Sequence, residues 1–107
     1  MPPSRREKIE AMLEAEPNDL FLRYSLAMEL QKEGDHERSL GMLRGLMQEK
    51  PPHVAACFRA GQQLATLGHL DEARSALRDG IEAARTQGDA HAAGEMAEFL
   101  ASIGSWE

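Results

Sequence analysis

Apolar residues recur along the chain at intervals of three and four positions, which is the period of a helix with one buried face. Leu22, Leu26 and Leu30 show this spacing clearly. The alternation of apolar and polar residues that is typical of strands is missing. The pattern predicts helices over residues 4–15, 18–33, 36–50, 53–67, 70–86 and 90–103. The predicted loops are only two to four residues long, so successive helices are expected to lie antiparallel.

Polar residues and glycines mark the expected ends of these helices. The segment Ser4-Arg5-Arg6-Glu7 has the form of a capping box, in which Glu7 reaches back to the first free amide. The other expected N-caps are Asn18, Asp35 and Asp89. Glycine reaches the left-handed backbone conformation without strain and therefore ends helices well. The expected stops are Gly34, Gly68 and Gly88.

The sequence also repeats itself with an offset of 34 residues. This offset pairs Pro17 with Pro51, Leu30 with Leu64, Gly34 with Gly68 and Leu43 with Leu77. Residues 4–16 match the second half of an earlier copy. Beyond the second copy the offset grows to 36, aligning residues 64–68 with residues 100–104. We expect a longer turn near residues 86–89 to take up the two extra positions.

A 34-residue pair of helices with a small residue in the first helix, a glycine at the turn and a closing proline resembles the tetratricopeptide repeat (TPR). With Leu20 as the first position, the small residue falls on Ala27 and Gly61. The chain departs from the repeat pattern at Arg23 and Cys57 (usually aromatic), at Gly80 (usually alanine) and at Arg85 (usually the closing proline). We regard the change at Gly80 as mild.

The resemblance implies an all-α fold, a TPR-like right-handed helical solenoid of six antiparallel helices. They would form a half repeat, two full repeats and a terminal half repeat in a single domain over residues 1–107. The implied function is a protein–protein interaction module that binds a peptide or a helix of a partner in a concave groove. The alternative is a structural assembly unit that self-associates through its terminal helices. An enzyme is not expected.

The groove positions that the resemblance implies carry aromatic, apolar and charged side chains. The expected partner-binding residues are Phe21, Tyr24, Met28, Lys32, Phe58, Arg59, Gln62 and Glu98. The aromatic rings and the thioether would form a patch suited to an apolar side chain. The plainer alternative is that some of them pack against a neighbouring helix. Arg59 alone could meet a C-terminal carboxylate, and such an exposed ion pair contributes under ~1 kcal/mol, which disfavours the chaperone-carboxylate clamp of some family members.

Charge narrows the choice of partner. The 107 residues include 12 Lys and Arg and 18 Asp and Glu, which gives a net charge of −6. A surface of this sign repels phosphate backbones and anionic lipids, so neither nucleic acid nor a membrane is expected to bind. The chain shows no secretory leader and no apolar run of the ~18 residues that a membrane span needs. A soluble, cytoplasmic protein is therefore expected.

Few residues could support catalysis or bind a metal. Cys57 is the single cysteine and is expected to fill a tight contact between helices, because the sequence identifies no base beside it. The histidines lack a partner in a ligand spacing such as H-E-x-x-H, so no metal or cofactor is expected. These histidines are His36, His53, His69 and His91.

The two ends of the chain carry contrasting patterns. The first predicted helix is expected to expose one charged face, formed by Arg6, Glu7, Lys8, Glu10 and Glu14. The last predicted helix carries an apolar stripe that would cover the preceding helix pair, formed by Met96, Phe99, Leu100 and Ile103. Trp106 follows this stripe and is expected to fold back and seal the end.

Overall fold

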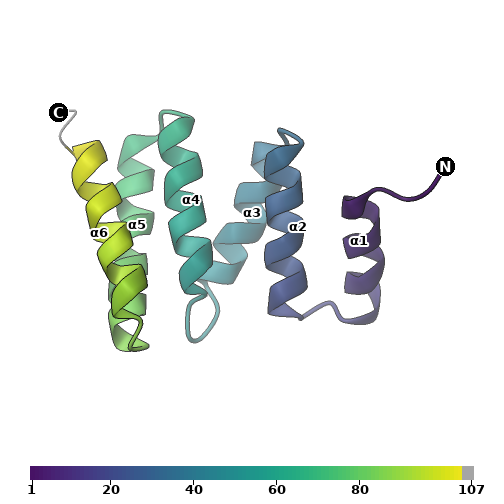
Figure 1. Cartoon of the computed structure of the whole chain (residues 1–107), viewed down its shortest axis with the longest axis horizontal. Helices are drawn as coiled ribbons and strands as arrows, with labels where there is room; N and C mark the ends of the chain where they lie inside the picture. Colours follow the sequence, from purple (N-terminus) through teal and green to yellow (C-terminus); the bar gives the residue numbers. More distant parts are fainter. Residues whose placement is uncertain (105–107) are drawn as a thin grey trace. The chain divides into compact units, whose positions relative to one another are not determined.

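A computed structural model describes residues 1–104, and every regular element in that range is an α-helix (Figure 1). The helices are α1 (Arg5–Ala15), α2 (Leu20–Lys32), α3 (His36–Met47), α4 (Val54–Thr66), α5 (Leu70–Thr86) and α6 (Ala90–Gly104). They confirm the predicted all-α, TPR-like class. The chain divides into two compact units, residues 1–46 and the residues from Met47 onward. Successive helices within each unit run antiparallel. That the whole chain forms a single domain stays a prediction.

Most of the predicted helix ends are confirmed. The Ser4 hydroxyl accepts a hydrogen bond from the Glu7 amide at 3.1 Å, and the Glu7 carboxylate accepts one from the Ser4 amide at 2.9 Å. This is the predicted capping box. The predicted stops Gly34, Gly68 and Gly88 all have positive φ, at 83°, 87° and 78°. One predicted cap was wrong: Asn18 lies outside α2, because the Asp19 carboxylate accepts from the Leu22 amide at 2.9 Å and takes the N-cap position.

Prolines explain why α3 and α5 differ in length. The prediction that the third helix reaches residue 50 was wrong, since α3 ends at Met47 and residues 48–53 form the connection. The residue before a proline disfavours helical geometry, and Pro51 follows Lys50. Arg85 stands at the corresponding place in the second copy, and α5 continues to Thr86. The extra residues therefore lengthen α5, and the longer turn expected near residues 86–89 was wrong.

The first unit is built on an apolar core that α1, α2 and α3 share. Ile9, Leu26 and Leu30 are buried together, and Leu13 and Met42 pack against them. Beside this core, the buried Ser39 hydroxyl of α3 donates a hydrogen bond of 2.7 Å to the Ala27 carbonyl of α2. This bond links α2 and α3, the two helices of the first repeat, at a position where both residues are small.

Ion pairs hold α1 against its neighbours as well. The Arg5 guanidinium lies 2.6 Å from the Glu29 carboxylate, and Arg6 lies 2.8 Å from Glu33. Glu10 pairs with Arg6 at 2.9 Å and with Arg38 of α3 at 3.6 Å. The prediction that Arg6 and Glu10 belong to a purely solvated face was therefore wrong: both are half-buried and link α1 to α2 and α3.

Small residues allow close packing in the second unit. Ala56 and Ala60 of α4 and Ala73 and Ala84 of α5 are buried, and these two helices pack against each other. A Cβ on Gly61 would stand 2.7 Å from the Leu77 side chain, so the two helices pack too tightly there for a larger residue. On α6, Met96 and Ile103 are buried and Phe99 and Leu100 half-buried, which confirms the apolar stripe. Trp106 lies outside the described residues.

Candidate partner-binding surface

Helix α2 presents the first group of predicted binding residues. Its buried face carries Leu22, Leu26 and Leu30. The other face carries Phe21, whose side chain is 74% exposed, together with Tyr24 and Met28, which are half-buried. Leu20, directly after the Asp19 cap, is also exposed, at 42%. The beginning of α2 thus leaves two large apolar side chains uncovered.

Lys32 lies at the end of the same helix and is exposed; its role in binding stays a prediction. Its ammonium stands 3.6 Å from the Glu29 carboxylate, which also pairs with Arg5. Glu29 itself is buried. A partner that binds Lys32 would therefore contact an ammonium group that already lies beside Glu29 and Arg5.

The second unit carries the remaining predicted residues on α4 and α6. The rings of Phe58 and Phe99 pack with their centroids 6.2 Å apart and their planes tilted by 58°. Both side chains are half-buried, so part of each ring stays accessible. Gln62, one turn after Phe58, is half-buried, and Arg59 and Glu98 are exposed.

The predicted four-residue patch joins residues of both units. Phe21, Tyr24 and Met28 belong to the first unit and Phe58 to the second. Their assembly into one surface stays a prediction. Within the second unit, the contact between Phe58 and Phe99 was not predicted. The spacing of Phe99 within α6 indicates only that it faces the preceding helices. The alternative that an aromatic residue packs on a neighbouring helix therefore applies in part to Phe58.

The cysteine has the environment of a packing residue. Cys57 is buried, and a Cβ on Gly80 would stand 2.7 Å from the Cys57 Cβ. Burial, with a smaller contribution from the charge of Asp79, raises the pKa of the Cys57 thiol to about 11. The thiol is therefore protonated at neutral pH, and the thiolate is the form that acts as a nucleophile. The predicted role of Cys57 as a small apolar residue agrees with this environment.

One histidine of α6 lies beside a carboxylate of the same helix. The His91 Nε2 lies 3.3 Å from the Glu95 Oε1, one turn away, a contact that was not predicted from the sequence. Both side chains are exposed. Across residues 1–104, no three His, Cys, Asp or Glu side chains are grouped so that they could hold a metal ion. His53 has a structural role, because its Nδ1 accepts a hydrogen bond from the Ala56 amide at the start of α4.

Comparison with known proteins identifies the family. The tetratricopeptide repeat model matches residues 30–104. TPR repeat-containing protein PA0015 of Pseudomonas aeruginosa is 31% identical over 97 residues, which span 91% of this chain and 92% of that protein. The solution structure of protein BPP2914 from Bordetella parapertussis superposes with a TM-score of 0.81 at 26% identity, covering 97% of this chain and 90% of that one. The chain belongs to the tetratricopeptide repeat family.

Membership sets the general class of activity. TPR repeats are generally protein–protein interaction modules, and the family is typically non-enzymatic. In the described part of the chain, no helix is both long enough and apolar enough to cross a membrane.

Proposed function

We propose that this chain binds a peptide or a helix of a protein partner through the exposed faces of α2, α4 and α6. The residues proposed to bind are Phe21, Tyr24, Met28, Lys32, Phe58, Arg59, Gln62 and Glu98. The proposal takes the two units as parts of one domain that presents these faces together. It also takes the partner to be a protein, since a net charge of −6 opposes binding to nucleic acid. We propose the cytoplasm as the compartment in which the two meet.

The observation that carries this proposal is the exposure of Phe21. A phenylalanine that is 74% exposed beside a leucine that is 42% exposed leaves apolar area in water at the start of α2. Exposed apolar surface of this kind marks interaction sites when it is grouped with polar residues. The half-buried rings of Phe58 and Phe99 offer a second apolar area on α4 and α6.

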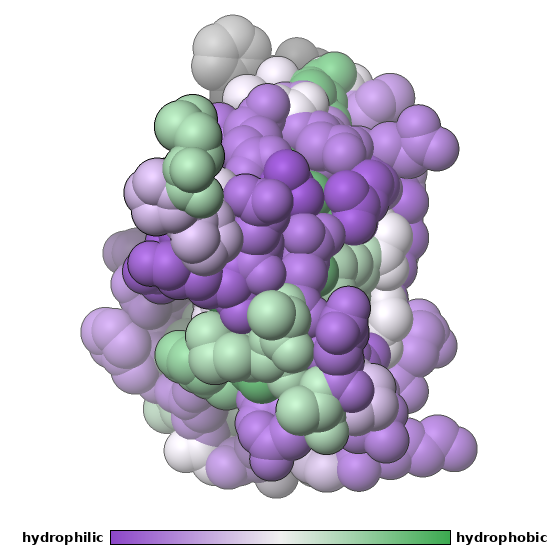
Figure 2. All heavy atoms as spheres, turned by 90° about the vertical axis from the view of Figure 1, so that its right-hand side faces the viewer, coloured by the Kyte–Doolittle hydropathy of each residue, from purple (hydrophilic) through white to green (hydrophobic). Residues whose placement is uncertain are grey.

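The alternative, self-association through the terminal helices, has less support at α1. Figure 2 shows the side of the molecule on which α1 lies in Figure 1, and hydrophilic side chains cover most of that face. On α1 itself, Met12 is the large apolar residue that is exposed, at 49%. Stable interfaces between copies of a chain bury mainly apolar surface.

Affinity capture with matched variants tests the proposal. The wild-type chain, Phe21→Ala, Phe58→Glu and Met12→Ala would each be used to capture proteins from the native cell. A bound protein would then be identified and its segment titrated. We expect Phe21→Ala and Phe58→Glu to weaken binding of that segment at least about tenfold, as loss of an aromatic anchor does. Met12→Ala, which removes an exposed apolar residue of α1, should leave it unchanged. Equal binding by the wild type and both aromatic variants would refute the proposal.

A further inference from the structure

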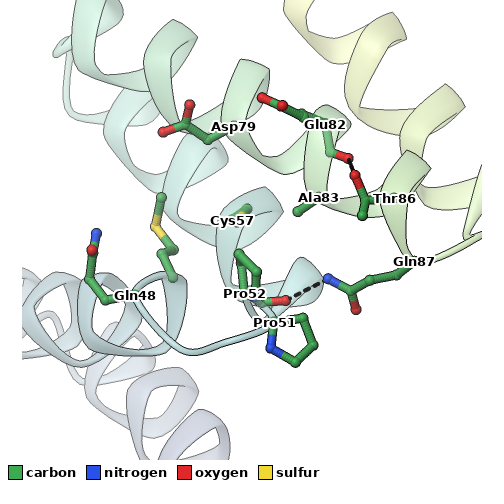
Figure 3. Close-up of a pocket in the computed structure, with 10 residues that line it drawn as sticks. Gln48, Pro51, Pro52, Cys57, Asp79, Glu82, Ala83, Thr86 and Gln87 are labelled. Carbon is green, nitrogen blue, oxygen red and sulfur yellow. Dashed lines mark hydrogen bonds between the residues drawn. The ribbon is translucent and has the colours of Figure 1, made fainter.

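A cavity of about 400 Å³ opens on the second unit (Figure 3), and neither Phe58 nor Phe99 lines it. Cys57 contributes to this cavity, whereas the next residue of α4, Phe58, packs against α6. The remaining wall comes from α5, from Met47 and from the connection that follows it. The cavity thus lies on a different side of α4 from the surface proposed above.

Part of the cavity lining is apolar. The Met47 thioether, the Pro52 ring, the Ala83 methyl group and the protonated Cys57 thiol line it. The Gln87 amide donates a hydrogen bond of 2.9 Å to the Pro52 carbonyl, which ties the end of α5 to the proline segment. This bond links two walls of the cavity. A lining of this kind suits an aliphatic chain several carbons long.

Another part of the lining is acidic. Asp79 and Glu82 stand three residues apart on α5, both are exposed, and both line the cavity. Figure 3 shows them on the α5 side, with the two prolines across the opening. The arginines of the same stretch of α5, Arg78 and Arg85, are not part of the lining. The cavity therefore combines apolar lining groups with two carboxylates on its α5 side.

We propose that this cavity docks a basic segment of a protein partner by taking in one arginine or lysine side chain. The methylene stem would lie against Met47 and Ala83, and the cationic head would reach Asp79 and Glu82. Long basic side chains bury their stems on apolar surface while the charge stays at the rim. Charge complementarity selects this occupant, because an acidic segment would meet like charge at the rim and on a chain of net charge −6.

A titration followed by ¹H–¹⁵N NMR on the full chain tests the proposal. The probes are acetyl-Gly-Leu-Arg-Leu-Gly-amide, the same peptide with glutamate in place of arginine, and arginine amide alone. The arginine peptide should cause saturable shifts at the amides around Met47, Asp79 and Ala83 with a Kd of up to about 1 mM, and the glutamate peptide should cause none. Arginine amide should bind more weakly than the arginine peptide, because it lacks the flanking residues.

Two charge variants sharpen this test. The double variant Asp79→Asn/Glu82→Gln should raise the Kd of the arginine peptide about fivefold or more, as expected for two partly exposed ion pairs. Glu14→Gln/Glu16→Gln removes the same charge from two exposed residues of the first unit that do not line the cavity, and it should change the Kd less than twofold. Phe58→Glu should not affect these shifts, which separates this site from the proposed function.

Several outcomes would overturn the proposal. The first is the absence of saturable shifts with the arginine peptide, and the second is equal binding by the glutamate peptide. The third is an unchanged Kd in the Asp79→Asn/Glu82→Gln variant. Binding of arginine amide as tight as that of the peptide would define a site for a small cation and would likewise refute docking of a protein segment.

Discussion

Gly80 of α5 lies so close to Cys57 of α4 that a Cβ on residue 80 would stand 2.7 Å from the Cys57 Cβ and 2.6 Å from the Met96 sulfur. The absence of a side chain at residue 80 therefore sets how closely α5 approaches both α4 and α6. The structure corrects the view that glycine is a mild change from alanine at this position. Alanine would not fit without movement of the helices.

Gly80→Ala is expected to destabilise the protein although alanine is the better helix former. Forcing a methyl group into this contact should cost about 1–3 kcal/mol of unfolding free energy. The matched control is Gly94→Ala on α6, where a Cβ meets nothing within 4 Å. That change should stabilise by about 0.5–1 kcal/mol through helix propensity. Urea denaturation followed by circular dichroism measures both, and the same sign for the two variants would contradict the packing argument.

The turn glycines permit a different test. Gly68 has a φ of 87°, in the left-handed region that β-branched residues avoid. Gly68→Val should lower the unfolding free energy by about 1–2 kcal/mol or more, and Gly68→Asn should lower it less, because asparagine tolerates this conformation better. The same order is expected at Gly34. If the valine and asparagine variants lost the same stability in thermal denaturation, backbone strain would not explain the preference for glycine at these positions.

Ser39 provides a test of the first repeat. Its buried hydroxyl donates to the Ala27 carbonyl at 2.7 Å, and the corresponding residue of the second copy is Ala73. Ser39→Ala should cost about 1 kcal/mol, the usual net value of one such hydrogen bond. Ser75→Ala, at an exposed position of α5, should change the unfolding free energy by less than about 0.5 kcal/mol. Equal effects would show that this bond adds nothing to the docking of α3 on α2.

The thiol gives a pH dependence whose sign follows from its environment. The folded pKa of Cys57 is about 11, whereas a thiol in an unfolded chain ionises near pH 8.5. Between these two values only the unfolded state gains from losing the proton, so stability falls as pH rises from about 8.5 towards 11. Cys57→Ala should remove this part of the alkaline loss. Parallel pH–stability curves for the wild type and the alanine variant would show that the thiol is not held protonated by folding.

Separating binding from folding is the last test. Phe21 is 74% exposed, so Phe21→Ala should change the unfolding free energy by no more than about 0.5 kcal/mol. Leu26, on the buried face of the same helix, belongs to the core with Ile9 and Leu30. Leu26→Ala should cost about 2–5 kcal/mol. A large loss of stability in Phe21→Ala would assign that ring to the core and remove the main support for the proposed surface.

Local chemistry explains which parts of the fold could be predicted. The helix stops at Gly34 and Gly68 and the capping box at Ser4 depend on residues within a few positions of each other, and all are confirmed. The choice of Asp19 over Asn18 as a cap was not predictable, because both side chains are suitable acceptors next to one another. The end of α3 at Met47 could have been anticipated from the proline at residue 51.

Contacts between distant residues were predicted less well. The ion pair between Glu10 and Arg38 joins α1 to α3, which are separated by α2 along the chain. No spacing in the sequence predicts this pair. The same is true of Phe58 with Phe99 and of the cavity beside Asp79. Each depends on how helices meet in space. The repeat period predicts that they pack, but it does not predict which side chains touch.

The ring of Phe58 contacts Phe99 of α6. Binding of a ligand at Phe58 is therefore coupled to the packing of α6 on α4. A ligand that competes with Phe99 for the face of Phe58 would loosen α6, and by thermodynamic reciprocity anything that loosens α6 would favour that ligand. A ligand that accepts the paired rings as they stand would instead hold α6 in place. The response of α6 would thus distinguish one kind of partner from the other.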